Sequence, residues 1–157
     1  MLKIKFILVG RTRSPFLKEG EGFYLERLRH YAPIRWIEVK SEKIKKGKSE
    51  EEVLHSEGRA ILQKIEKRDY LTALDRSGKQ YNSRELAAWL QRVSIRTGGW
   101  VCFIIGGPIG LSEEIKGRSD KILSLSRLTF THEMSRIFLL EQLYRAFTIL
   151  EGHTYHR

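Results

Sequence analysis

With 157 residues, 41% of them hydrophobic, and no strong compositional bias, the chain has the size and apolar content of one folded domain, predicted over residues 1–157. These values argue against a disordered chain, and no stretch approaches the roughly 18 consecutive apolar residues of a membrane-spanning helix. The 29 Lys and Arg against 19 Asp and Glu leave a net charge of +10, which is typical of a domain that meets nucleic acid or another anionic surface. A basic surface that only keeps the chain soluble is the alternative.

The N-terminal part predicts two strands with a helix between them. Residues 2–9 form an apolar run in which Lys3 and Lys5 alternate with apolar side chains and are expected to point outward. A helix is predicted over residues 15–31, because it begins with Pro, which fits the first turn. A second strand is predicted over residues 34–39.

Residues 40–48 contain five lysines and one glycine but no apolar face. This pattern predicts an exposed loop. Because the segment has no hydrophobic side to bury, we expect it to become ordered only on a polyanion.

Four elements are predicted between residues 50 and 105. Three glutamates favour a helix start at residue 50, because negative charge stabilises a helix N-terminus, and this helix is predicted to reach residue 67. A strand over residues 70–74 is followed by a helix that begins after Asn82, where Glu85 completes a pattern close to a capping box. A buried strand is predicted over residues 100–105.

The remaining elements are a short helix over residues 112–117, a strand over residues 121–125 and an apolar helix over residues 133–150. Five strands joined by helices predict an α/β fold with a mostly parallel sheet and helices on both faces. Ligands of such sheets bind outside the carboxyl ends of the strands. The segments that follow the third, fourth and fifth strands are therefore expected to converge.

Gly106 and Gly107 directly follow the fourth strand, which favours a binding loop because no Cβ keeps a ligand from the backbone. A tight turn without a ligand is the alternative. The chain lacks the glycine-rich dinucleotide fingerprint, the P-loop and the G-x-S-x-G elbow, so dinucleotide oxidoreductases, P-loop nucleotidases and serine hydrolases are disfavoured.

Cys102, the single cysteine, lies within an apolar strand and is expected to behave as a small buried hydrophobic side chain. The five histidines show no zinc-ligand spacing, so no metal is expected. The N-terminal apolar run breaks at Gly10, too early for a secretory signal. We therefore expect a cytoplasmic protein without a membrane partner.

The final helix is apolar around almost its whole circumference, more than one face of a small sheet can bury, which predicts a homodimer. Glu141 and Arg145 stand four residues apart and can pair on one face. They form either a structural ion pair at a subunit interface or a site in which Glu141 positions Arg145 toward a substrate phosphate or base. His132, at the start of this helix, is either a polar cap or a catalytic group.

The chain ends with Tyr155, His156 and Arg157, an aromatic ring, an imidazole and a guanidinium. Two interpretations remain open for this tail. It lines an active site, or it is an ordered end that packs on a dimer.

Several motifs together resemble the ribosomal RNA large-subunit methyltransferase H family, a group of small SPOUT-class enzymes, and the resemblance extends over the full length. The motifs are Ala73-Leu-Asp-Arg-Ser-Gly-Lys79, Phe103-Ile-Ile-Gly-Gly-Pro-Ile-Gly-Leu-Ser112, Leu123-Ser-Leu-Ser-Arg-Leu-Thr-Phe-Thr-His132, Glu141-Gln-Leu-Tyr-Arg-Ala-Phe147 and the closing Tyr155-His156-Arg157. Thr131 stands where the family is expected to place Pro.

The resemblance implies methylation of N3 of a pseudouridine in 23S ribosomal RNA on the assembled ribosome, with S-adenosyl-L-methionine as the methyl donor. It also implies a SPOUT-type fold with a C-terminal trefoil knot and a homodimer with the knots at the interface. By position, the residues expected to contact the cofactor are Leu74, Gly106, Gly107, Leu125, Ser126, Arg127, Leu128, Thr129 and Phe130.

The candidate catalytic residues are Arg145, Tyr155, His156 and Arg157. A cation from Arg145, His156 or Arg157 would stabilise the negative charge that develops on the imide, and His156 or a water molecule would accept its proton. Tyr155 would stack on the base. Two other functions stay open, a non-enzymatic ribosome- or RNA-binding factor and a flavodoxin-like mononucleotide binder.

Overall fold

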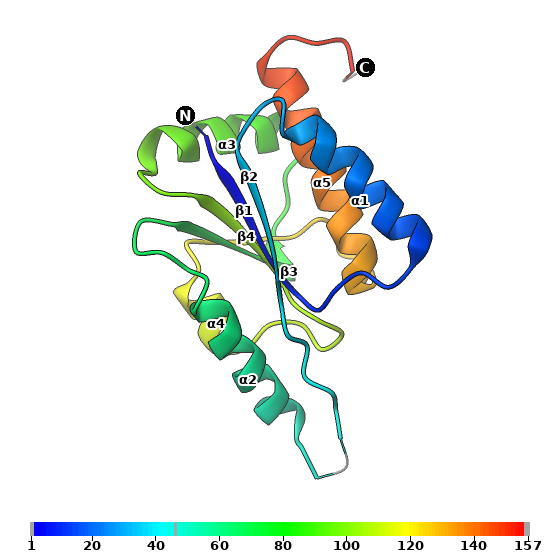
Figure 1. Cartoon of the computed structure of the whole chain (residues 1–157). Coiled ribbons are helices and arrows are strands. Elements are labelled where there is room, and N and C mark those ends of the chain that lie inside the picture. Colours follow the sequence, from blue (N-terminus) through cyan, green and yellow to red (C-terminus); the bar gives the residue numbers. More distant parts are fainter. Residues whose placement is uncertain (1, 46, 156–157) are drawn as a thin grey trace.

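The structure of this chain, a computed structural model that describes residues 2–45 and 47–155, consists of a five-stranded sheet between two layers of helices (Figure 1). The strands lie in the order β2-β1-β4-β3-β5, and every neighbouring pair is parallel. Their bounds are β1 Ile4–Val9, β2 Ile34–Val39, β3 Tyr70–Lys79, β4 Val101–Ile105 and β5 Lys121–Leu123. The helices are α1 Pro15–Leu28, α2 Glu50–Leu62, α3 Ser83–Arg96, α4 Glu113–Arg118 and α5 His132–Leu150. The predicted α/β fold with a parallel sheet and helices on both faces is confirmed.

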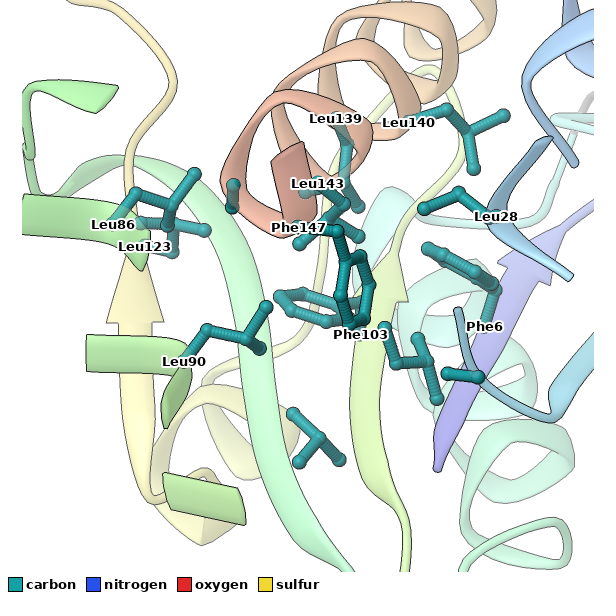
Figure 2. Close-up of a cluster of buried hydrophobic side chains, with 14 of the residues drawn as sticks. Phe6, Leu28, Leu86, Leu90, Phe103, Leu123, Leu139, Leu140, Leu143 and Phe147 are labelled. Atoms are coloured by element: carbon teal, nitrogen blue, oxygen red, sulfur yellow. The ribbon is translucent and has the colours of Figure 1, made fainter. Parts of the chain in front are cut away.

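Each face of the sheet carries its own hydrophobic core. Helices α1, α3 and α5 cover one face, where Phe6 of β1 and Phe103 of β4 stack with their ring centroids 5.9 Å apart and pack with Leu143 of α5 (Figure 2). Helices α2 and α4 cover the other face, where Ile61 and Ile115 pack with apolar side chains of the same strands. Strands β1 and β4 are therefore buried on both sides, as central strands of a parallel sheet are.

The alternation of residues in the first strand predicts that Lys5 points outward. In the structure it points inward. Its side chain is completely buried, and its ammonium nitrogen lies 2.6 Å from a carboxylate oxygen of Asp69 and 3.1 Å from one of Glu66. It also donates to the carbonyl oxygen of Lys64 at 3.1 Å. The prediction is wrong because β1 is covered on both faces and has no solvent side. The buried charge is tolerated because the equally buried Asp69 neutralises it.

The same ion pair explains why α2 is shorter than predicted. The helix ends at Leu62 instead of residue 67. In the turn that follows, Glu66 donates its backbone N–H to Asp69 Oδ2 at 2.9 Å, and both carboxylates face the ammonium of Lys5. The backbone N–H of Glu66 is thus bonded to a side chain and not to the carbonyl oxygen four residues earlier, as a continued helix would require.

Strand β3 runs five residues beyond its predicted end at Leu74, to Lys79, and both of these residues pair with Leu123 of β5. The register shift arises where Ser77 donates its N–H to the carboxylate of Asp75 at 3.0 Å. Gly78 then passes so close to β5 that a Cβ on it would lie 2.6 Å from backbone atoms of the neighbouring strand. The edge strand β5 itself is shorter than predicted and ends at residue 123.

Helix α5 is covered on several sides within the chain, by α1, by α3 and by the sheet. Its apolar circumference is therefore largely buried without a second subunit, which corrects the argument that led to the predicted homodimer. Apolar surface nevertheless stays exposed on this side of the molecule. Phe138 of α5 is 38% exposed, and Phe16 and Phe23 of α1 are 71% and 48% exposed.

Candidate active site

A cavity of about 1090 Å³ opens where the loops after β4 and β5 meet the middle of β3. Its volume is sufficient for a nucleoside-sized ligand. The segments after the third, fourth and fifth predicted strands thus converge, as expected for the carboxyl ends of parallel strands. Eight of the nine residues predicted to contact the cofactor line this cavity: Leu74, Gly106, Gly107, Leu125, Ser126, Leu128, Thr129 and Phe130. The ninth, Arg127, does not line the cavity and lies in a separate groove beside it.

The glycine loop is both a tight turn and a cavity wall. Gly110, with a φ of +80°, donates its N–H to the carbonyl oxygen of Gly107 at 3.0 Å. A Cβ on Gly106 would lie 2.3 Å from the carbonyl oxygen of Gly110, a distance that backbone atoms cannot accommodate. Glycine is therefore required at position 106 to close the turn, and the backbone of the loop itself forms this part of the wall.

The opposite wall comes from the N-terminal ends of α1 and α5. The carboxylate of Glu133 accepts backbone N–H groups from Arg13 at 2.5 Å and Ser14 at 3.2 Å, which joins the loop before α1 to the start of α5. Burial acts to raise the pKa of Glu133, but the hydrogen bonds from Ser14 and Arg13 outweigh it and leave the pKa below its ordinary value. The carboxylate therefore stays ionised and keeps Ser14 and Phe16 at the cavity.

Arg136 supports this wall from beneath and was not predicted as a site residue. Its side chain is fully buried, and its guanidinium donates to the carbonyl oxygens of Val9 at 2.9 Å and Gly10 at 2.7 Å and to the hydroxyl of Thr12 at 3.0 Å. Thr12 in turn donates to the buried carboxylate of Glu21. The sequence contains one indication of this role, because Arg136 is a charged residue on the side of α5 that is otherwise apolar.

His132 is half-buried and lines the cavity. Burial lowers its pKa, and the nearby Arg136 guanidinium lowers it further. Its imidazole is therefore neutral at pH 7 and can accept a proton. The helix cap is Thr131 and not His132, because the Thr131 hydroxyl accepts the N–H of Met134 at 3.2 Å. At the position where the resemblance leads one to expect Pro, this chain thus uses a side-chain cap.

Arg145 and Tyr155, two of the four predicted catalytic residues, lie together at the far end of α5. Arg145 Nη2 and Glu141 Oε1 are 2.7 Å apart, and the same oxygen accepts the Tyr155 hydroxyl at 3.1 Å. The Arg145 guanidinium lies 4.9 Å from the centroid of the Tyr155 ring. Burial, followed by the charge of Glu141, raises the pKa of Tyr155 to about 12, so the phenol stays protonated. Glu141 and Arg145 thus pair on one face of α5, as their spacing predicted, and both interpretations of the pair, structural and substrate-binding, include this contact.

This cluster is remote from the cavity in the same subunit. Arg145 comes thirteen residues after His132 on one helix, a separation of about 20 Å at the usual rise per residue. Figure 1 shows the end of α5 at the same end of the molecule as the start of β1, whereas the cavity lies where the strands end. His156 and Arg157 lie outside the described residues.

Residues 2–156 match a family described as "Predicted SPOUT methyltransferase". The chain belongs to the SPOUT methyltransferase family. Three relatives named "Ribosomal RNA large subunit methyltransferase H" confirm the resemblance inferred from the motifs. The protein from Syntrophotalea carbinolica is 43% identical over 156 residues and covers 99% of each chain. Those from Syntrophobacter fumaroxidans and Streptococcus thermophilus are 43% and 40% identical over 157 and 159 residues, and each alignment covers 99% of this chain and 100% of the relative.

Two solved structures share the fold of this chain at low sequence identity. The crystal structure of a probable methyltransferase from Bordetella pertussis Tohama I has a TM-score of 0.52 at 12% identity and covers 92% of this chain and 94% of that chain. A probable methylase family protein from Haemophilus influenzae Rd KW20 has a TM-score of 0.50 at 14% identity and covers 96% of this chain and 67% of that chain. The trefoil knot of this SPOUT chain stays a prediction.

Over residues 2–45 and 47–155 of this SPOUT methyltransferase, no group of three or more His, Cys, Asp or Glu is placed to hold a metal ion. Within the same residues, no helix has both the length and the apolar character for crossing a membrane. Cys102 is buried, as predicted, and burial raises the pKa of its thiol to about 12, so it is not a nucleophile of the site.

Proposed function

We propose that this SPOUT methyltransferase transfers a methyl group from S-adenosyl-L-methionine to N3 of a pseudouridine in 23S ribosomal RNA, on the assembled ribosome. One observation carries the proposal. In a chain whose full length matches proteins named ribosomal RNA large subunit methyltransferase H, eight of the nine residues expected to contact the cofactor line one cavity.

The cavity wall fits the proposed cofactor. Leu74, Ile105 and Leu125 provide apolar surface for an aromatic base, whereas the glycine loop and Ser126 provide polar groups. Because Gly106 lacks a Cβ, the loop can close on Gly110, and this closed loop lines the cavity. When bound, S-adenosyl-L-methionine supplies a methyl group that its positively charged sulfur already activates.

The chain's own residues then have two tasks. They hold the imide nitrogen in line with the methyl group, which is the larger contribution, and they handle the proton that leaves N3. The neutral imidazole of His132 lies at the cavity and can accept this proton. A cation must stabilise the charge on the imide, and Arg145, one of its predicted sources, is about 20 Å away in the same subunit.

A homodimer resolves this separation in our proposal. Phe16 and Leu128, 71% and 72% exposed, flank the cavity, and the Phe130 ring at its wall lies 4.6 Å from that of the exposed Phe138. Monomeric proteins rarely leave such a group of large apolar side chains in water. We expect a second copy to cover it and to bring Tyr155 and its neighbours to the cavity.

The test of the proposed function is methylation of ribosomes that lack the modification. Purified protein and S-adenosyl-L-methionine labelled in the methyl group are expected to transfer label to 23S ribosomal RNA, and mass spectrometry of the digested RNA is expected to show N3-methylpseudouridine. A non-enzymatic RNA-binding factor would bind ribosomes without binding the cofactor or transferring label.

We expect Gly106→Ala to weaken S-adenosyl-L-methionine binding at least tenfold, or about 1.4 kcal/mol. The added methyl would lie 2.3 Å from the carbonyl oxygen of Gly110, so the turn must open and the wall must move. Isothermal titration calorimetry measures the affinity. Gly117→Ala is the control, because a Cβ there meets no atom within 4 Å. Equal affinities of the two variants would remove the glycine loop from the cofactor site.

The loop between β2 and α2 is expected to bind ribosomal RNA through its exposed lysines. Glu42 of this loop pairs with Lys48 at 3.4 Å and donates its backbone N–H to the buried Glu57, so the loop is anchored while Lys43 and Lys45 remain exposed. Lys46 lies outside the described residues. The predicted exposed loop is thus confirmed for the residues that the structure describes.

Replacing Lys43 and Lys45 with Ala is expected to lower the slope of log binding constant against log salt concentration by about 1.5 units, because each lost phosphate contact removes just under one unit. Binding of 23S ribosomal RNA at several salt concentrations measures this slope. Lys64→Ala with Lys67→Ala is the control, because it makes an equal charge change at exposed residues near the opposite end of the strands, where the Lys64 carbonyl contacts Lys5. If both double variants give the same slope, the loop is only a solvated surface.

A further inference from the structure

A second, smaller hollow lies beside the cavity and is not explained by cofactor binding. It has a volume of about 630 Å³ and lies where the end of β3 meets the segment after β5. Its lining contains no large apolar side chain and consists of Arg76, Ser77, Gly78, Gln80 and Arg127. Arg76 also lines the larger cavity, so the two hollows share a wall. We call the smaller one the arginine groove.

The fold builds this groove from the irregular end of β3. The Asp75 carboxylate accepts the backbone N–H of Ser77. Gly78 then packs directly on the backbone of Ile122, so the end of β3 lies against β5. A side chain at position 78 would prevent this approach. The two guanidiniums, which are 51 positions apart in sequence, thereby come to line one hollow.

The groove carries two positive charges that no direct ion pair within the described residues neutralises, although Arg76 lies close enough to Asp75 to help lower the pKa of its carboxyl. Both arginines are exposed, and among residues 2–45 and 47–155 neither forms an ion pair. The nearest acidic residue in sequence, Asp75, is instead turned toward Ser77 and Lys116, whose ammonium lies 3.9 Å away. Arg76 Nη1 donates to the Thr129 hydroxyl at 3.0 Å, which joins the groove to the wall of the cavity.

The surface next to the groove is also positively charged. The ammonium groups of Lys79 and Lys121 each lie 5.7 Å from the centroid of the Tyr81 ring. A polar hollow with two guanidiniums and two neighbouring ammonium groups does not suit an apolar peptide or a lipid chain. The planar guanidinium matches the oxygens of a phosphate group and binds them with two parallel hydrogen bonds.

We propose that the arginine groove binds the phosphodiester backbone of the RNA strand immediately beside the nucleotide that enters the cavity. The inference rests on the proposed function, because it takes that nucleotide to be part of ribosomal RNA. The shared wall at Arg76 places the bound phosphate next to the reacting base. Arg127, expected from the resemblance to contact the cofactor, contacts RNA instead.

Two variants test the groove, Arg127→Gln alone and Arg76→Gln with Arg127→Gln. The control is Arg92→Gln. Arg92 is exposed and lies in the second half of α3, which ends near the start of β4, whereas the cavity lies beyond the end of that strand. Binding of 23S ribosomal RNA is measured against salt concentration without cofactor, and methylation kinetics and calorimetric cofactor affinity are measured separately. Arg76 lines both hollows, whereas Arg127 does not line the cavity, so the single variant changes the groove without changing the cavity wall.

We expect the slope of log binding constant against log salt concentration to fall by about 0.8 in the single variant and about 1.5 in the double variant. The KM for ribosomal RNA is expected to rise about tenfold in the double variant, with a smaller change in kcat. Arg127→Gln should bind S-adenosyl-L-methionine like the parent protein, and Arg92→Gln should match it in every measurement.

The outcomes separate the groove from the proposed function. If the parent protein methylates 23S ribosomal RNA but the double variant has the slope and KM of Arg92→Gln, the groove proposal is overturned. If the parent protein does not methylate it, the proposed function fails, and the salt slopes still decide the groove. Calorimetric titration with inorganic phosphate is the last arm. Phosphate binding that the double variant loses while its RNA binding is unchanged would identify a free-anion site and overturn the RNA assignment.

Discussion

Truncation after Thr154 is expected to lower methyl transfer to ribosomes by about 100-fold or more, the scale of a lost positioning or electrostatic group. It removes Tyr155, His156 and Arg157 but none of the residues that line the cavity. S-adenosyl-L-methionine binding and dimerisation should therefore be largely retained. Rates of label transfer, calorimetry and sedimentation measure the three properties. Full-rate methylation by the truncated protein would exclude the tail from the mechanism.

A mixing experiment asks whether the tail acts across a subunit interface. The truncated chain is combined with full-length Gly106→Ala, which is expected to bind cofactor poorly but keeps its tail. In verified heterodimers, one cavity with an intact glycine loop then faces an intact tail, and part of the activity should return. Absence of rescue would place tail and cavity in the same subunit, against the separation of about 20 Å along α5.

Tyr155→Phe is the matched control for the truncation. The variant keeps the ring that lies against the Arg145 guanidinium and loses only the hydroxyl that donates to Glu141. If the tail acts through stacking and charge, this variant should retain most of the activity. A loss as large as that of the truncation would instead assign the effect to the hydroxyl.

Arg136→Met is expected to lower the free energy of unfolding by about 3 kcal/mol, the scale of breaking a buried ion network by removing one partner. The substitution leaves the carbonyl oxygens of Val9 and Gly10 without the guanidinium and the buried Glu21 without a nearby positive charge. Urea unfolding monitored by circular dichroism measures the change. Arg92→Met, which removes an exposed arginine, should change the stability by less than about 0.5 kcal/mol.

The pH dependence distinguishes the loss of charge from the loss of packing. Burial raises the pKa of Glu21 in the folded chain, while Thr12 and Arg136 act to lower it. Without Arg136 this pKa rises further. A carboxyl whose pKa is higher in the folded state binds more protons there, so its contribution to stability falls as pH rises through and above the unfolded value of about 4.5.

The deficit of Arg136→Met relative to the parent protein should therefore be larger at pH 7 than at pH 4.5. In chains that carry Glu21→Gln the carboxyl is absent, so Arg136→Met should lower their stability equally at the two pH values. A deficit that is independent of pH with and without Glu21→Gln would show that Arg136 acts through packing alone.

Local chemistry made much of the fold predictable. Asn82 and Glu85 form the predicted capping box, with Glu85 donating its N–H to Asn82 at 2.9 Å and Asn82 donating its own to Glu85 at 2.8 Å. The alternation of strands and helices led to the parallel sheet, and the glycines after β4 led to the cavity. Each of these inferences depends on residues within a few positions of one another, where spacing alone determines the geometry.

Other site features depend on contacts between distant residues. Period-two alternation led to an outward Lys5, but only the layers on both sides of β1 show that it is buried against Asp69. Arg136 reaches Thr12 across 124 positions, and no local pattern encodes that hydrogen bond. Arg127 lies outside the cavity and shares a groove with Arg76, which is 51 positions away in sequence.

The sequence by itself thus determined the element types, the parallel α/β class and, through the motifs, the family and the loops that form the cavity. The tertiary structure alone decided which charged side chains are buried, which face the cavity and which lie about 20 Å from it. The reason is physical. Secondary structure follows from local periodicity and capping, whereas the cost of burying a charge depends on which distant groups the packed layers bring to neutralise it.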